Sequence, residues 1–253
     1  MTYRQARQGS LTETNAWLHS LEKDLPFVGL EKDKSQMYKI CERARTLLDS
    51  IDDINSPTEV TLSSIREICE HDRASTSWRR GPNWAYKTIN RSQITQDKPQ
   101  ACQFPLSVQL HQDIWVAYEW NYNRTGRMIL HRHLLESINR LQSSNRYTKA
   151  AFSLEVFSIK RASLDIIQTL ADEVLSTVPQ SLGDIDHDGK ILEDSRGAHV
   201  RKGIGGYFLL WPIKIIKSLE HVTLEQRNAA QAVFERIREC TGMKATLGGL
   251  SNI

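Results

Sequence analysis

The sequence predicts an all-α protein in which two long helices form the centre. Apolar residues recur at helical spacing over most of the chain, capping residues precede several of these runs, and no alternating strand pattern of useful length appears. The chain has 253 residues, 40% of them hydrophobic and 25% charged. A chain of this size and composition buries a core without disulfides or metal ions. We therefore expect a single helical domain with about eight helices.

Three amphipathic helices are predicted in the first 75 residues. A capping box at Ser10 precedes the first of them, and the second spans residues 33–51. Pro57 suits the first position of the third helix, because its missing N–H would have no partner there. Residues 1–75 thus form an N-terminal segment, to which we assign no family, ahead of residues 76–253.

The two central helices are predicted over residues 107–142 and 148–177, where apolar residues recur at intervals of three and four. Between residues 75 and 106 the pattern is irregular and interrupted by three X-Pro pairs, which indicates loop with at most short helices. We expect Pro179 and Gly183 to end the second long helix.

The C-terminal third is predicted as a polar loop over residues 184–202 followed by two helices. The first of these begins near Gly205, and Pro212 should kink or interrupt it, because proline lacks the amide hydrogen. Thr223 and Gln226 form a capping box for the second, which Gly242 ends.

Charge and cysteine content exclude several classes of protein. The net charge of +3 is too small to indicate nucleic-acid binding by itself. The four cysteines are scattered without a CxxC pair, which argues against a disulfide scaffold and a local zinc finger. The N-terminus has no secretory pattern, and no apolar run reaches the ~20 residues of a membrane span. We expect a nuclear or cytoplasmic protein that is neither secreted nor membrane-bound.

Four motifs follow one another in the second segment. They are Trp120-Asn121-x-x-Arg124-x-x-Arg127 within 113–131, the stretch 176–183, the Gly-Gly-Tyr-Phe-Leu-Leu-Trp-Pro stretch 205–212, and Gln226-Arg227 with 242–245. Their order and spacing over residues 78–250 resemble the fungal-specific transcription factor domain. That domain is the helical regulatory region found C-terminal to binuclear zinc-cluster DNA-binding modules. The resemblance implies an all-helical regulatory domain.

The chain departs from this family in its cysteines. The zinc-cluster module needs six closely spaced thiolates to hold two zinc ions, and four isolated cysteines cannot form it. We therefore expect no direct sequence-specific DNA binding from this chain and no cofactor or metal. The expected function is a regulatory or effector-binding domain, whose partner is a small-molecule ligand or a protein, a second copy included. The alternative is a cofactor-free cyclase or isomerase of fungal secondary metabolism built on the same fold.

The most chemically loaded pattern is a helical stripe formed by Trp120, Arg124, Arg127 and His131, at positions i, i+4, i+7 and i+11. If the chain is an enzyme, His131 moves a proton, with His133 as the alternative histidine. Arg124 and Arg127 would then hold an anionic or carbonyl group. The favoured interpretation is a structural polar seam in which the arginines stack on tryptophan. The predicted ligand-binding residues are Trp115, Tyr118, Trp120, Asn121, Tyr207 and Trp211.

Two further patterns each have a functional alternative. Asp184, Asp186, Asp188 and Gly189 imitate the start of a calcium loop, but Ser195 stands where the bidentate glutamate belongs, which favours a solvated acidic loop. Basic and aromatic residues alternate over 73–98, a pattern that binds single-stranded nucleic acid in some proteins and more often lies along a groove edge or a solvated loop.

Overall fold

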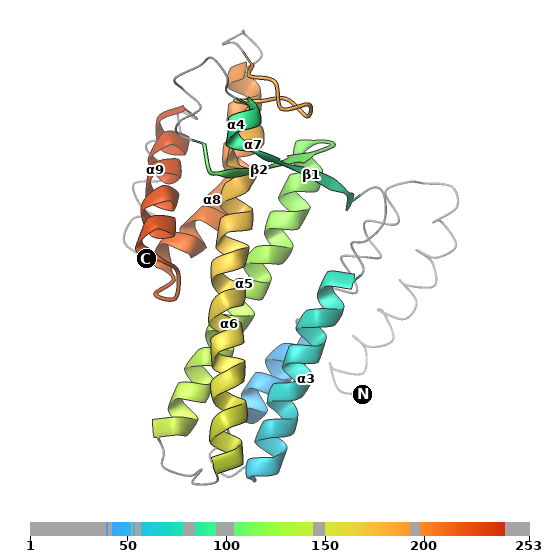
Figure 1. Ribbon diagram of the computed structural model, residues 1–253, viewed down its shortest axis with the longest axis vertical. Helices are drawn as coiled ribbons and strands as arrows, with labels where there is room; N and C mark the ends of the chain where they lie inside the picture. The colour runs from blue at the N-terminus through green and yellow to red at the C-terminus, as the bar shows by residue number, and fades with distance from the viewer. Residues whose placement is uncertain are drawn as a thin grey trace, which may run out of the picture. The chain divides into compact units, whose positions relative to one another are not determined.

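The computed structural model describes residues 39, 42–51, 53, 57–77, 84–94, 104–143, 150–192 and 198–240. The described part is mostly helical, which confirms the predicted fold class (Figure 1). Internal contacts divide the chain into two compact units, residues 1–79 and 80–253. The predicted change of segment after residue 75 falls just before this division. No helix among the described residues combines the length and apolar character needed to cross a membrane.

The N-terminal unit contains helical residues 42–51 and helix α3, Thr58–Ser77. Arg43 donates from Nε and Nη2 to Glu67 Oε1, at 2.9 and 2.7 Å, and so links the two helical stretches. The predicted start of a helix at Pro57 is confirmed, because the Pro57 carbonyl accepts the first backbone bond of α3, from Thr61. The helix predicted after Ser10 lies outside the described residues.

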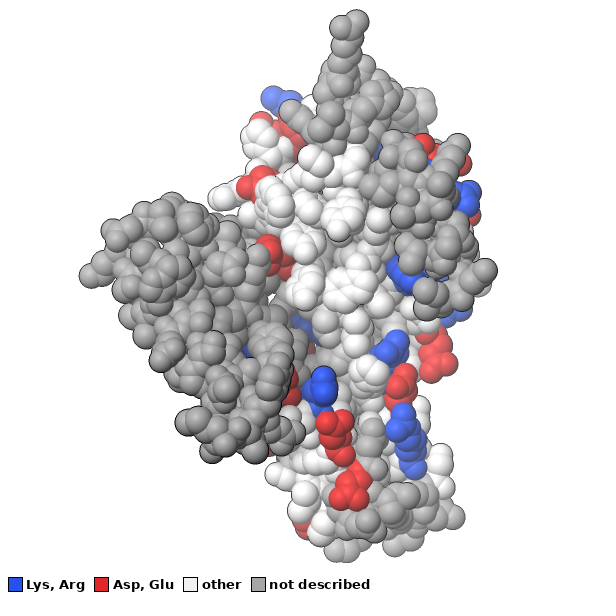
Figure 2. Space-filling model, turned by 180° about the vertical axis from the view of Figure 1, so that it is seen from behind, with Lys and Arg blue, Asp and Glu red and all other residues white. Residues whose placement is uncertain are grey.

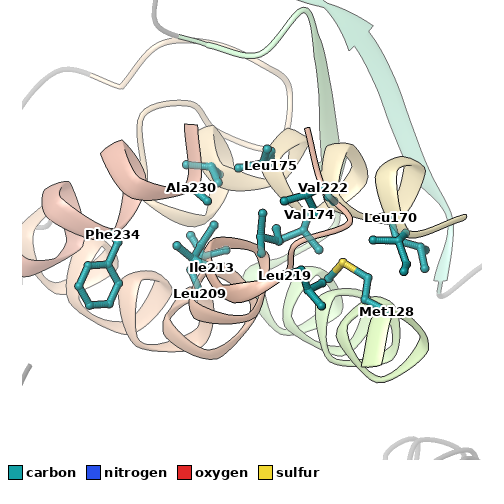
Figure 3. Close-up of a cluster of buried hydrophobic side chains, with 14 of the residues drawn as sticks. Met128, Leu170, Val174, Leu175, Leu209, Ile213, Leu219, Val222, Ala230 and Phe234 are labelled. Carbon is teal, nitrogen blue, oxygen red and sulfur yellow. The ribbon is translucent and has the colours of Figure 1, made fainter. Parts of the chain in front are cut away.

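The second unit is built on two long helices, α5 (Ile114–Ser143) and α6 (Ala150–Ser176), which pack together and confirm the two predicted central helices. Helices α8 (Ala198–Ser218) and α9 (Leu224–Cys240) pack against each other and against α6. Their apolar side chains meet in one core (Figure 3), which includes Met128, Leu170, Val174, Leu209, Ile213 and Phe234.

A two-stranded antiparallel hairpin precedes α5. Strand β1 (Tyr86–Asn90) pairs with β2 (Ser107–His111) in a register that places Tyr86 opposite His111, and the short helix α4 (Arg91–Ile94) lies between them in sequence. The prediction of loop or short helix before residue 106, and of a helix from 107, was therefore wrong over these strands. The sequence of β2 alternates polar and apolar residues, but over only five positions, which is too short a run to distinguish a strand from the start of a helix.

Helix α5 begins after Asp113 rather than at residue 107. The Asp113 carboxylate accepts hydrogen bonds from the backbone N–H groups of Trp115 and Val116, at 2.8 and 2.9 Å. This is the geometry of a helix N-cap, in which a side-chain oxygen satisfies amides that the helix leaves unbonded. The cap fixes the first turn of α5, from which Trp115 projects to the surface.

The C-terminal elements differ from the prediction at two points. Helix α8 begins at Ala198, inside the predicted polar loop, and continues through Pro212 without interruption. The short helix α7 (Val178–Ser181) follows α6, and Gly183 then adopts a positive φ of 69°. The capping box of α9 is confirmed, because Thr223 and Gln226 exchange reciprocal bonds of 3.0 and 3.1 Å between side chain and backbone.

Candidate functional site

Arg124 lies at the centre of a buried hydrogen-bond network, with only 1% of its surface exposed. Its Nε donates to Glu173 Oε2 on α6 at 2.8 Å, Nη1 to Asn121 Oδ1 at 3.2 Å, and Nη2 to Gln109 Oε1 on β2 at 2.7 Å. Burial lowers the pKa of the guanidinium, while the charge of Glu173 and the phenol of Tyr86 raise it. Arg124 therefore connects the hairpin to both central helices.

Trp120 and Asn121 belong to this network. The Trp120 ring lies 5.2 Å from the Arg124 guanidinium carbon, and its indole N–H donates to the Trp84 carbonyl at 2.9 Å. Asn121 donates from Nδ2 to Thr177 Oγ1 at 2.7 Å. These two predicted ligand-binding residues thus lie beside Arg124. They are separate from the other four predicted ligand-binding residues. This arrangement matches the polar seam that the sequence analysis favoured.

The remaining candidate catalytic residues are further along α5. His131 is buried, with its Nδ1 3.1 Å from the Ser163 hydroxyl on α6, and Arg127 is half-buried. The predicted arrangement of Arg124, Arg127 and His131 along one helix is present, and their catalytic role stays a prediction.

Sequence reasoning did not single out His111, the last residue of β2. Neither ring nitrogen finds a hydrogen-bond partner among the described residues, while its backbone N–H and C=O both bond to the Gln180 side chain at 2.7 Å. Burial, helped by the charge of Arg124, lowers the pKa of His111 from 6.5 to about 3. The imidazole is therefore neutral at physiological pH. The ring lies 5.0 Å from the ring of Tyr86, and the backbone of His111 is held by α7, so its environment depends on residues distant in sequence that no local pattern could have indicated.

Six aromatic residues from α5 and α8 form a continuous surface, which we call the aromatic face. Trp115 and Tyr118 both contact Phe208, with ring centroids 4.8 and 4.6 Å apart, and Tyr122 contacts Trp211 at 5.2 Å. Further ring contacts of 6.1 to 6.2 Å connect neighbours on the same helix. The members of the aromatic face are Trp115, Tyr118, Tyr122, Tyr207, Phe208 and Trp211.

Four rings of the aromatic face are open to solvent. The exposed fraction is 60% for Trp115, 48% for Tyr122, 62% for Tyr207 and 40% for Trp211, while Tyr118 and Phe208 between them are half-buried. Helices α5 and α8 pass behind α6 in Figure 1, and the view from behind shows a broad uncharged area over the upper part of this unit (Figure 2). Contiguous exposed aromatic side chains of this kind are uncommon on the surface of a monomeric protein.

The aromatic face contains four of the six predicted ligand-binding residues: Trp115, Tyr118, Tyr207 and Trp211. Sequence reasoning missed Tyr122 and Phe208. Tyr122 follows Tyr118 at the i+4 position, so helical spacing alone could have added it. Phe208 could be found only from the packing of α8 on α5.

A groove of about 930 Å³ lies elsewhere on the second unit, between α9, the end of α6 and residues 104–107. None of the aromatic-face residues lines it. Its polar groups serve packing contacts: Arg236 forms an ion pair with Asp184, and Gln226 donates to Asp172 at 2.7 Å. We assign no ligand to this groove.

The acidic segment after Gly183 is a folded turn whose tip, at His187 and Asp188, is exposed to solvent. Asp184 pairs with Arg236 of α9, and one Asp186 oxygen accepts the backbone N–H groups of Asp188 and Lys190, each at 2.9 Å. Among the described residues, no group of three or more metal-ligating side chains is close enough to hold a metal ion. Of the basic and aromatic segment 73–98, residues 78–83 and 95–98 lie outside the described part, and the rest contributes to α3, β1 and α4.

No family model, no curated protein and no solved structure matches the chain. The site is therefore interpreted from its own geometry and chemistry.

Proposed function

We propose that the chain is a helical regulatory domain, of the kind found in fungal transcription factors, that binds a protein partner through the aromatic face. One observation carries the proposal: α5 and α8 bring six aromatic rings together on the surface, and four of them are extensively exposed. Tyrosine and tryptophan are enriched at protein interfaces, where they supply much of the binding energy.

The rings of this surface are held by one another before any partner arrives. Tyr118 and Phe208 lie 4.6 Å apart, and each also contacts Trp115. Contacts of this kind restrict side-chain rotation, so less conformational entropy is lost on binding. The exposed rings also border half-buried ones, which gives a partner a continuous apolar surface to cover.

The same geometry favours binding over catalysis. All three nitrogens of the Arg124 guanidinium are engaged in bonds that join β2, α5 and α6. The aromatic face contains tyrosine, tryptophan and phenylalanine, none of which is charged at neutral pH, and a general acid–base catalyst needs a group with a pKa near the operating pH.

Affinity capture from extracts of the source organism tests this function. We expect the wild-type chain to retain one or more proteins that the double variant Tyr122→Ser/Trp211→Ser retains at least ~10-fold less, because truncation of central aromatic residues costs interfaces more than other changes. The matched control is Leu154→Ser/Phe157→Ser, which removes two even more exposed apolar residues from α6.

One outcome of the capture experiment would contradict the proposed function. If both double variants and the wild-type chain retain the same proteins in the same amounts, the aromatic face is not the recognition surface. Circular dichroism melting of each variant shows that a loss of binding does not reflect unfolding.

A further inference from the structure

We infer that the aromatic face binds a proline-rich segment in the polyproline II conformation. This inference rests on the proposed function and specifies the chemistry of the partner. It follows from the hydrogen-bond donors on the exposed rings, and from the acceptors that a partner must supply to them.

The exposed rings carry donors that the described residues leave unused. Trp115 and Trp211 each have an indole N–H, which can only donate, and Tyr122 and Tyr207 each have a hydroxyl. Within the described part of the chain, none of these four groups forms a hydrogen bond, although the rings themselves are in contact. A partner that covers these rings must supply acceptors, because a buried donor without a partner weakens binding.

A proline-rich segment supplies acceptors and almost no donors. Proline has no backbone N–H, and the polyproline II helix has no internal hydrogen bonds, so its carbonyl groups remain free to accept. The carbonyl groups of an α-helix are already bonded within the helix. Proline rings also pack well on aromatic side chains, and the conformation is largely preformed, which lowers the ordering cost.

The arrangement of rings on two helices suits an extended ligand of this type. Trp115 and Tyr122 project from α5, Tyr207 and Trp211 from α8, and the half-buried Tyr118 and Phe208 connect the two sets. Because none of the six residues is charged, recognition would depend on ring packing and hydrogen bonds to carbonyl oxygens.

Titration of the full chain with a polyproline peptide of about ten residues, followed by NMR of the indole N–H resonances and by calorimetry, tests the inference. We expect the resonances of Trp115 and Trp211 to shift on addition of peptide. The Trp120 resonance provides an internal control and should stay in place, because its N–H already donates to the Trp84 carbonyl at 2.9 Å.

Two variants separate hydrogen bonding from ring packing. Trp115→Phe/Trp211→Phe keeps aromatic rings and removes both indole donors, so we expect peptide affinity to fall by roughly 10-fold. Trp120→Phe, which removes an indole away from the aromatic face, should leave the affinity unchanged, with thermal melting used to show that each variant is folded.

Three results would overturn the inference: no binding at millimolar peptide, equal binding of a glycine–serine peptide, or unchanged affinity in the Trp115→Phe/Trp211→Phe variant. If the peptide fails while protein capture still depends on Tyr122 and Trp211, the inference is wrong and the proposed function stands. If protein capture is also unaffected by Tyr122→Ser/Trp211→Ser, both the inference and the proposed function are wrong.

Discussion

His111 illustrates how one side chain acquires its properties from elements distant in sequence. The hairpin places this residue next to α7, where the Gln180 side chain bonds to its backbone. The positive charge of Arg124 disfavours a second positive charge on the His111 ring. Its ring lies 5.0 Å from that of Tyr86. A neutral imidazole in this position is tolerated, and a charged one is not.

This environment predicts acid sensitivity. Between pH 6.5 and about 3, the unfolded chain binds a proton at His111 and the folded chain does not. The free energy of unfolding should therefore fall as the pH decreases through this window, with His111 contributing up to about 1.4 kcal/mol per pH unit. In urea unfolding measured at several pH values, His111→Phe should reduce the dependence of the free energy of unfolding on pH.

The exposed His187 provides the control, and His187→Gln should leave this pH dependence as in the wild-type chain. Parallel curves for wild type and His111→Phe would contradict the prediction.

Helix α8 depends on a glycine for its position. A Cβ atom at Gly205 would lie 1.6 Å from the Ser181 carbonyl oxygen, so the backbones of α8 and α7 approach each other directly. Gly203, two residues earlier in the same helix, has no atom within 4 Å of the corresponding point. Two glycines of one helix thus have different roles, and the aromatic residues Tyr207, Phe208 and Trp211 follow within two turns.

Alanine substitutions at these two glycines should have opposite effects. Gly205→Ala should destabilise the chain by at least about 3 kcal/mol, because backbone atoms cannot move aside easily. Gly203→Ala should stabilise it by about 0.5–1 kcal/mol, through the higher helix propensity of alanine. Thermal or urea unfolding measures both. Equal effects of the two substitutions would show that α8 does not pack on α7 in this way.

At the scale of the whole second unit, polar contacts attach the hairpin to the helices. Arg124 bonds to Gln109 of β2 and Glu173 of α6, and Gln180 of α7 bonds to both backbone groups of His111. Apolar contacts continue this attachment, since Ile185 of the acidic turn packs in a cluster with the strands and Phe104. The hairpin is therefore part of the same folded unit as the helices.

Replacement of Arg124 by lysine tests this attachment. Lysine keeps the positive charge, but one ammonium cannot reproduce the planar set of donors that reaches Gln109, Asn121 and Glu173. We expect Arg124→Lys to lower the free energy of unfolding by about 2–3 kcal/mol, because buried acceptors lose their partners. The exposed Arg238 at the end of α9 provides a matched control, and Arg238→Lys should change stability by less than about 0.5 kcal/mol. A similar small effect at both positions would contradict the structural role of Arg124.

Much of the helical fold follows from local patterns. The second central helix, the end of the first, the start of α3 after Pro57 and the capping box of α9 were predicted close to their observed bounds, because periodicity and capping depend on residues within a few turns. The start of the first central helix was predicted seven residues too early, because β2 occupies residues 107–111. The hairpin was missed because each strand has only five residues: β1 does not alternate polar and apolar residues, and the alternation in β2 is too short to stand out beside the helical pattern that follows it.

The sequence by itself determined the helical class, the two central helices and a concentration of aromatic residues near Trp115 and Tyr207. The tertiary structure alone decided which aromatic residues share a surface. It separates Trp120, which packs on Arg124, from Tyr118 and Tyr122, which contact Phe208 and Trp211 of α8. Helical periodicity is a property of neighbouring residues, whereas the burial of Arg124 and His111 and the joining of α5 to α8 depend on contacts between residues far apart in the chain.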